Sequence, residues 1–192
     1  MGRLQLITVT SHTGFNYHGG VAATEETVRW LTAEEQRSWR SWLSAHTLLR
    51  EALDREMKAD HGISLADYEI MVRLSEAPDR QMRMSDLAEM TLSSRSRLSH
   101  QVARMESDRL VERSECETDR RGTLCRLTDT GWRLLVRSAP SHVTSVRDHL
   151  VDVLDPAELA AVGASCQKVT DALLASRAVP ACEPDGVAST PA

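Results

Sequence analysis

The chain has 192 residues, of which 41% are hydrophobic and 27% charged, so it is long enough for one soluble globular domain with a hydrophobic core. No apolar run approaches the roughly 18 residues that span a bilayer, and the N-terminus lacks the apolar core of a secretory signal, so we expect a cytoplasmic protein with no membrane segment. The net charge of −5 hides a basic segment, because residues 80–137 hold 12 Arg against 9 Asp or Glu. This balance suggests one localised anionic partner, although a solvated surface would fit the same count.

The N-terminal part of the chain is predicted to be a tail followed by one long helix. Residues 1–23 show no hydrophobic period and are expected to be flexible. Residues 30–62 contain a long helix, because Thr32 and Glu35 have the spacing of a capping box and Gly62 can end it. One face of this helix carries its apolar and aromatic side chains, at Trp39, Trp42, Leu43, His46, Leu49, Leu53 and Met57.

Residues 63–127 predict a winged helix-turn-helix. Ser64 begins a helix that stops before Pro78. A short extended piece follows, and Ser85 is placed to cap a brief second helix. A longer helix then covers residues 94–108 and leads into a predicted hairpin.

The hairpin is expected to form the wing. A loop with the sequence DRRG, residues 119–122, joins two strand-like runs. Two adjacent arginines repel each other at a hairpin tip and contribute little to folding, whereas arginine is preferred in a narrow minor groove of DNA. We therefore expect Arg121, with or without Arg120, to enter a minor groove, and Asp119 to orient a guanidinium. An ordinary polar turn is the alternative.

Residues 128–176 predict two more long helices, the first capped by Thr128 and the second by Asp155 ahead of Pro156. Residues 177–192 read as a disordered tail. The apolar stripes of the outer helices have no evident partner within one chain, which suggests a two-fold homodimer. The predicted fold class is mainly α with a small β-hairpin wing, a winged helix-turn-helix flanked by long dimerisation helices.

The helix over residues 94–108 has one apolar and one polar face. Leu98, Val102 and Met105 fall within one apolar sector, whereas the polar face has short side chains at its centre and cations at its edges. Such a face suits a DNA major groove, where serine and histidine approach base edges and arginine reaches guanine or phosphate. A solvated face that happens to carry arginines is the alternative. The candidate DNA-binding residues of this helix are Ser94, Arg95, Ser96, Arg97, Ser99, His100 and Arg104.

These segments together resemble the winged-helix core of the MarR family of bacterial transcriptional regulators. The resemblance rests on SDLAEM, SRSRLSHQVARMESDRLVER, ETDRRG and CRLTDTG, preceded by ISLADYEIMVRLSEAP, and covers about residues 30–175. It implies a homodimer on a roughly palindromic promoter site in double-stranded DNA, with a recognition helix in each major groove and a wing in each minor groove. Arg121 matches the usual wing-tip arginine, and a repressor is more in keeping with the family than an activator.

The resemblance also implies a small aromatic or phenolic ligand between the dimer helices and the DNA-binding lobe. The candidate residues for this site are Trp39, Trp42, His46, Tyr68 and Met71. An aromatic and methionine stripe at helical spacing is also typical of a core or a dimer interface. With only 4% aromatic residues in the chain, a pocket rich in them is not guaranteed.

The four cysteines, Cys116, Cys125, Cys166 and Cys182, form no CxxC pair, so we expect reduced thiols and no metal site or cofactor. Cys116 and Cys125 are placed symmetrically about the arginine pair and would face each other in a regular hairpin. One hypothesis is that their oxidation locks the wing. The alternative is two thiols packed side by side.

Two other function classes compete with a DNA-binding regulator. The chain has no GxSxG, HExxH, phosphate-binding glycine loop or dinucleotide fingerprint, so we expect no enzyme and no catalytic residues. A winged helix used as a protein-interaction module, without specific DNA binding, is the second rival. The paired wing arginines argue against it, and strong salt dependence of DNA binding would separate the two.

Overall fold

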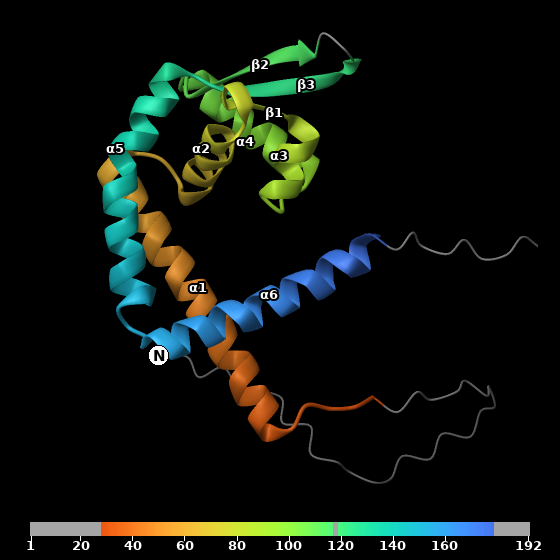
Figure 1. The fold of residues 1–192 in the computed structure, drawn as a ribbon, viewed down its shortest axis with the longest axis vertical. Coiled ribbons are helices and arrows are strands. Elements are labelled where there is room, and N and C mark those ends of the chain that lie inside the picture. The colour runs from red at the N-terminus through yellow and green to blue at the C-terminus, as the bar shows by residue number, and fades with distance from the viewer. Residues whose placement is uncertain (1–27, 117–118, 179–192) are drawn as a thin grey trace, which may run out of the picture.

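The computed structural model describes residues 28–116 and 119–178, and within these ranges no helix is long and apolar enough to cross a membrane. The chain forms a winged-helix lobe of short helices and a small sheet, from which long helices extend (Figure 1). The predicted fold class, mainly helical with a small antiparallel sheet, is confirmed.

Helix α1 (Ala33–His61) is the first of the long helices. Its start is a capping box, as predicted: Thr32 Oγ1 accepts from the Glu35 backbone N–H at 3.2 Å, and the Thr32 N–H donates to the Glu35 carboxylate at 2.7 Å. Gly62 ends the helix in the left-handed conformation, with a φ of 73°. Only the C-terminal half of α1 reaches the core, so its N-terminal half projects from the lobe.

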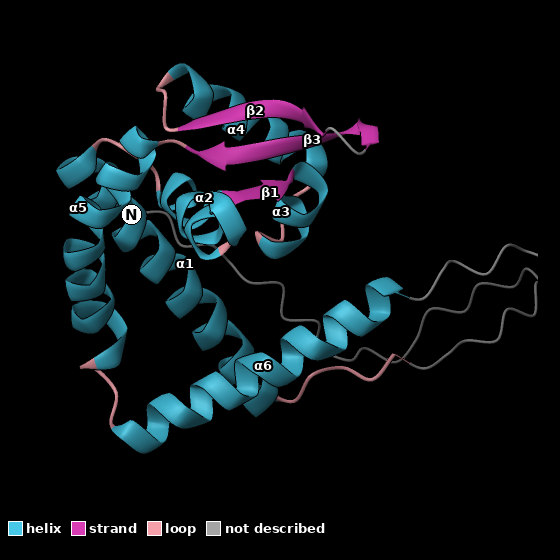
Figure 2. Ribbon diagram, turned by 45° about the horizontal axis from the view of Figure 1, so that its top comes forward, coloured by secondary structure: helices cyan, strands magenta, loops and turns pink. Residues whose placement is uncertain are grey.

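The lobe contains a helix-turn-helix and a three-stranded antiparallel sheet of order β1-β3-β2 (Figure 2). Ser64 and Ser94 cap α2 and α4 through their hydroxyl groups, as their positions predict. In chain order the elements are α2 (Leu65–Glu76), the 3₁₀ turn η1 (Pro78–Arg80), β1 (Gln81–Arg83), α3 (Met84–Met90), α4 (Arg95–Ser107), β2 (Val111–Cys116) and β3 (Asp119–Leu127).

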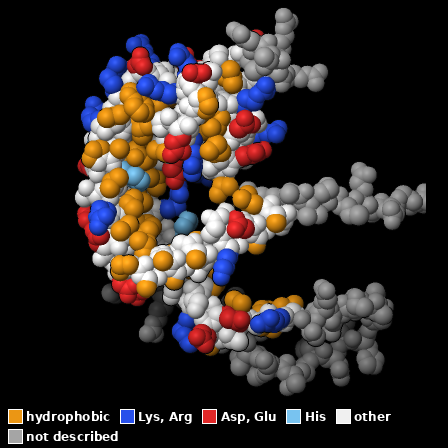
Figure 3. Space-filling view, viewed as in Figure 1, with side chains coloured by type: hydrophobic (Ala, Val, Ile, Leu, Met, Phe, Trp, Pro, Cys, Tyr) orange, Lys and Arg blue, Asp and Glu red, His pale blue; other side chains and the backbone are white. Residues whose placement is uncertain are grey.

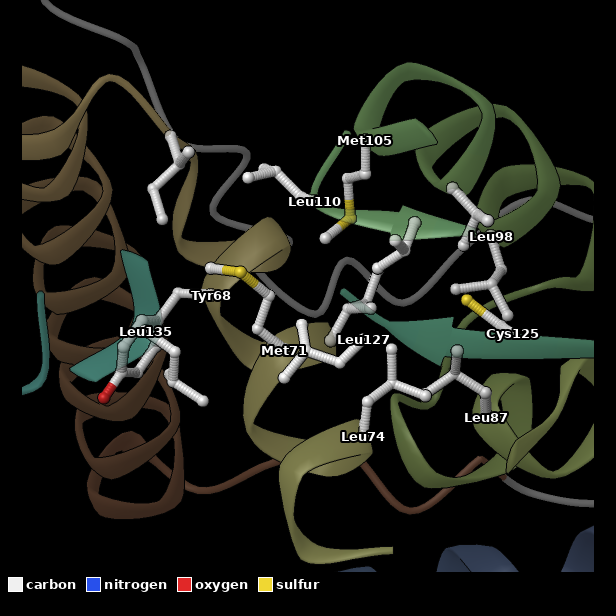
Figure 4. Packing of buried hydrophobic residues seen from close by; sticks show 14 of the residues in the cluster. Tyr68, Met71, Leu74, Leu87, Leu98, Met105, Leu110, Cys125, Leu127 and Leu135 are labelled. Carbon is white, nitrogen blue, oxygen red and sulfur yellow. The ribbon is translucent and has the colours of Figure 1, made fainter. Parts of the chain in front are cut away.

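One hydrophobic core holds the lobe together (Figure 4). Met71, Leu74 and Leu87 are fully buried, and Leu98 and Met105 of α4 join the same cluster. Because these side chains come from three helices that pack over the sheet, burial fixes the depth at which α4 sits on the lobe.

The start of α3 differs from the expectation. Ser85 lies inside the helix instead of capping it, because Arg83 ends β1 and already occupies the N-cap position in an extended conformation. The Ser85 hydroxyl donates to the neighbouring Asp86 carboxylate at 2.8 Å.

The wing also differs, because the DRRG sequence lies in β3 and not in a loop. The ladder of β2 and β3 is regular as far as the pair Glu115–Thr123, after which the register shifts and Cys116 pairs with Asp119. This irregularity leaves only residues 117–118, outside the described part of the chain, between the two strands.

The same register overturns the expected cysteine pair. Arg113, not Cys116, lies opposite Cys125, so the prediction that the two cysteines face each other is wrong. That prediction assumed a hairpin symmetric about the arginines, whereas the strands pair around a point nearer Cys116. Cys125 is fully buried, and burial raises the pKa of its thiol to about 12, which leaves almost no reactive thiolate at neutral pH.

The C-terminal helices begin at the predicted caps. Thr128 Oγ1 accepts from the Gly131 N–H at 3.0 Å, and Asp155 Oδ1 accepts two backbone N–H groups at 2.8 Å. Helix α5 (Asp129–Val146) packs along α1 and continues into a π-helical turn, η2 (Arg147–Val151), before the chain turns into α6 (Pro156–Ala178).

Within the described part of the chain, helix α6 makes few contacts with the other elements. Its described side chains are nearly all exposed, including Val162 at 43%, Val169 at 54% and Leu173 at 59%. Hydrophobic side chains also gather on the surface of the long helices in the space-filling view (Figure 3). Apolar surface of this extent is typical of a protein–protein contact.

Candidate nucleic-acid interface

The exposed face of α4 is the central feature of the candidate interface. Leu98, Val102 and Met105 are at most 1% exposed, so the predicted apolar sector is confirmed and the opposite face points to solvent. Ser94 Oγ accepts from the Arg97 N–H at 3.2 Å, and no acidic residue lies in the first turn. The helix therefore presents its partly positive N-terminus without an internal counter-charge.

A groove lies between the start of α4 and the wing. It has a volume of about 370 Å³. Two candidates from α4, Arg95 and Ser99, line it together with Gly122 and Thr123 of β3. The structure therefore brings the start of α4 and the turn-side half of β3 to one concave surface.

Two further arginines line this groove that sequence reasoning did not single out, Arg83 and Arg113. Arg113 already has a partner, because its Nε and Nη2 atoms donate to Glu106 at 3.0 and 2.7 Å. Arg83 lies on β1 and Arg113 on β2, and the sequence does not show that these two strands share a surface with α4.

The other side of α4 faces α2 and α1. Arg97, His100, Gln101 and Arg104 line a second groove there, with a volume of about 550 Å³. Ser96 is exposed and lines neither groove, because it lies between the two flanks of the helix. The predicted residues thus split into a wing side and an α2 side.

Arg104 has a partner that the sequence did not reveal. Its Nη2 donates to Asp67 Oδ1 at 2.9 Å, and the Asp67 side chain is only 8% exposed. Burial by itself would raise the pKa of Asp67, but hydrogen bonds from Ser64, Arg104 and Gln101 outweigh burial and hold the pKa below its usual value. Asp67 is therefore charged at neutral pH.

The wing candidates are the first three residues of β3, at the end of the strand nearest the turn: Asp119, Arg120 and Arg121. Their side chains lie outside the described part of the chain, so only their backbone position is given. That position is at the end of the hairpin that projects beyond the lobe (Figure 2).

The ligand candidates do not form one site. His46 and Tyr68 line a cleft of about 750 Å³ that also reaches α5 and the helix-turn-helix. The Tyr68 ring lies 4.4 Å from the His142 ring, and burial raises the pKa of Tyr68 and lowers that of His142. Arg50, Arg73 and Arg97 add positive charge to the lining of this cleft, and Glu69, which accepts from Arg50 at 3.3 Å, also lines it.

The other three candidates lie elsewhere. Met71 is fully buried in the core of the lobe, which agrees with the alternative of a packing role. Trp39 stacks on Trp42, and Trp42 on His46, each with ring centroids 5.6 Å apart. Trp42 and His46 line a second cleft, of about 530 Å³, with Val162 of α6. Among the described residues no group of His, Cys, Asp and Glu side chains could hold a metal ion.

Comparison with known proteins identifies close relatives. A family model described as the MarR family matches residues 61–122. The crystal structure of AbsC, a MarR family transcriptional regulator from Streptomyces coelicolor, shares 43% sequence identity over 77% of this chain and 99% of that chain, with a TM-score of 0.73. Sco3205, a MarR family transcriptional regulator from the same organism solved in complex with DNA, also shares 43% identity, over 77% of this chain and 92% of that chain, with a TM-score of 0.75.

A more distant structure supports the fold alone. Bordetella bronchiseptica BpsR, whose DNA binding is regulated by 6-hydroxynicotinic acid, shares 18% identity over 70% of this chain and 98% of that chain, with a TM-score of 0.62. The search of curated proteins finds no match.

Proposed function

The chain belongs to the MarR family of transcriptional regulators, a family without enzymatic activity, and from this premise we propose that it acts as a homodimeric repressor on a palindromic promoter site. Each subunit inserts α4 into a major groove and its wing into the adjacent minor groove. A relative with 43% identity has been crystallised with DNA, which supports DNA as the partner of this chain.

One observation carries the proposal: α4 is anchored by buried apolar residues and exposes a polar, cationic face with a capped N-terminus. Ser96 and His100 are exposed on this face and are short enough to approach base edges. Arg95 and Arg97 lie on its two flanks, where they can contact phosphate or guanine. Ser94 adds its backbone N–H, and Ser99 lines the groove next to the wing.

The wing completes the proposed contact. Arg121, with Arg120, enters the minor groove, and Asp119 orients a guanidinium. The support for these roles is the sequence pattern and the position of the residues at the far end of β3.

The homodimer is supported by the exposed apolar surface of the long helices. Trp39 and Trp42 are 50% and 47% exposed on α1, and among the described residues Val162, Val169 and Leu173 of α6 are 43–59% exposed. Pairing of α1, α5 and α6 between two copies would bury these surfaces. A palindromic site would require the two copies of α4 to lie on one side of the dimer, with half-sites about 34 Å apart.

Release by a small aromatic or phenolic acid is the proposed regulation. The cleft of His46 and Tyr68 combines aromatic rings with arginines, at Arg50, Arg73 and Arg97. The rings suit the aromatic part of such a ligand, and the arginines suit its acid group. Since Arg97 belongs to both this cleft and the candidate DNA surface, a bound acid would compete for a side chain that contacts DNA.

The test is a fluorescence-anisotropy titration of the protein on the promoter fragments flanking its own gene, at 50 and 200 mM salt. We expect tight, site-selective binding that weakens by about 10³-fold or more between the two salt concentrations. Arg97→Ala and Arg121→Ala should each impair it, whereas Arg137→Ala removes the same charge from the exposed surface of α5 and should not. Binding at the non-specific level, unchanged by either variant, would favour the protein-interaction module.

A further inference from the structure

Asp67 is a buried charge in a lobe whose core is otherwise apolar. Among the residues that the structure describes, Asp67 and Ser138 are the buried polar side chains, and the hydroxyl of Ser138 is satisfied within α5. A buried carboxylate is costly unless charged or polar groups surround it, so its partners indicate what it holds in place.

The two oxygens of Asp67 bind different helices. Oδ2 accepts from the N–H and the hydroxyl of Ser64, at 2.9 and 2.5 Å, and so caps the start of α2. Oδ1 accepts from Gln101 Nε2 at 3.2 Å and from Arg104 Nη2 at 2.9 Å, both on α4. Gln101 and Arg104 are three residues apart and therefore lie on one side of α4.

We propose that Asp67 is the positioning residue of the recognition helix, and that Arg104 acts as its counter-ion rather than as a primary DNA contact. This inference rests on the proposed function, because it concerns how α4 is presented to DNA. Apolar burial fixes the depth of α4 but is not directional. Two hydrogen bonds from one side of the helix fix its rotation, to which base contacts are sensitive within about 10–20°.

A second tether supports this arrangement. Glu106, near the end of α4, accepts from the backbone N–H and the guanidinium of Arg113 on β2, at 2.7–3.0 Å. The helix is thus held by charged hydrogen bonds on the α2 side and on the wing side. The exposed centre of its polar face, at Ser96 and His100, lies between the two tethers.

The test compares Asp67→Asn, Arg104→Met and the double variant with wild type. Glu76→Gln is the matched control, because it removes an acid from the same helix at an exposed position, where Glu76 pairs with Arg73 at 3.5 Å. The readout is the affinity for the bound promoter fragment and for a shuffled duplex of the same length, at two salt concentrations. Melting curves first establish a temperature at which every variant is folded.

We expect each single substitution to weaken binding to the promoter fragment by about tenfold, with binding to the shuffled duplex and the salt dependence unchanged. The double variant should be no weaker than either single variant, because both remove the same tether. Glu76→Gln should behave as wild type. If Asp67→Asn fails to fold, Arg104→Met still tests the proposal, because it leaves the hydrogen bonds between Ser64 and Asp67 at the start of α2 in place.

Other outcomes would overturn the proposal. A direct phosphate contact by Arg104 would make Arg104→Met weaken both duplexes and lower the salt slope by about one, with Asp67→Asn neutral. If Asp67→Asn lowered the melting temperature but left the ratio of affinities for the promoter fragment and the shuffled duplex unchanged, Asp67 would act only as a cap of α2. Wild-type protein that does not distinguish the two duplexes would instead overturn the proposed function itself, and this inference with it.

Discussion

The burial of His142 predicts how the stability of the protein depends on pH. Its ring packs on Tyr68, and burial lowers its pKa, although Glu69 acts weakly in the opposite direction. In the unfolded chain the same imidazole takes up a proton near its ordinary pKa of about 6.5. The unfolded state therefore binds more protons just below this pH, and stability falls as the pH drops through that window.

This sign leads to a prediction for His142→Gln. We expect the wild-type free energy of unfolding to decrease between pH 7.5 and pH 5.5, and the decrease to be smaller in the variant, which has no proton to gain. Urea denaturation at the two pH values measures the free energy of unfolding of wild type and of the variant. His100→Gln, at an exposed position of α4, serves as the control. Equal pH dependence of His142→Gln and wild type would contradict the assignment.

At the scale of one element, α4 begins at a cap whose contribution can be measured separately from DNA binding. Ser94→Ala removes the acceptor for the Arg97 N–H, and we expect a loss of about 1 kcal/mol in the free energy of unfolding. Ser96→Ala removes a hydroxyl two residues later that makes no cap, so its effect should stay within about 0.5 kcal/mol. Chemical denaturation without DNA compares the two, and equal effects would show that the cap is unimportant.

The elements also show what the sequence alone can predict. The starts of α1, α2, α4 and α5 were predictable, because a capping hydroxyl and its N–H partner are three residues apart. The buried side of α4 followed from the spacing of its apolar residues for the same local reason. Ser85 was misplaced because β1 pairing, a tertiary effect, decides where α3 begins.

The candidate site was only partly predictable. The exposed polar face of α4 is a property of one helix, so its residues could be named in advance. The bond from Arg104 to Asp67 joins residues 37 apart in sequence, and the shift at Cys116 depends on how two strands align. Neither has a local signal, which is why the sequence did not reveal the bond from Arg104 to Asp67 and why the wing turn was placed too late in the chain.

At the scale of the whole molecule, the lobe is a packed unit and the long helices are not. We expect Val169→Glu in α6 to weaken dimerisation, because it would place a charge in the apolar surface proposed to pair with a second copy. Light scattering across a concentration series would show a larger monomer fraction than in wild type. Lys168→Glu, next to it on the helix, is the control, and a wild-type monomer at all concentrations would contradict the proposed dimer.

The bare surface of α6 has a further consequence, for the cell that makes this protein. If α6 is covered by a second copy, as proposed, folding is tied to association, so mass action enters the stability of the regulator. Freshly synthesised chains at low copy number would leave this surface open to proteases, while accumulated chains would protect one another. The amount of the regulator would then depend more steeply on its rate of synthesis than the amount of a protein whose single chain covers its own apolar surface.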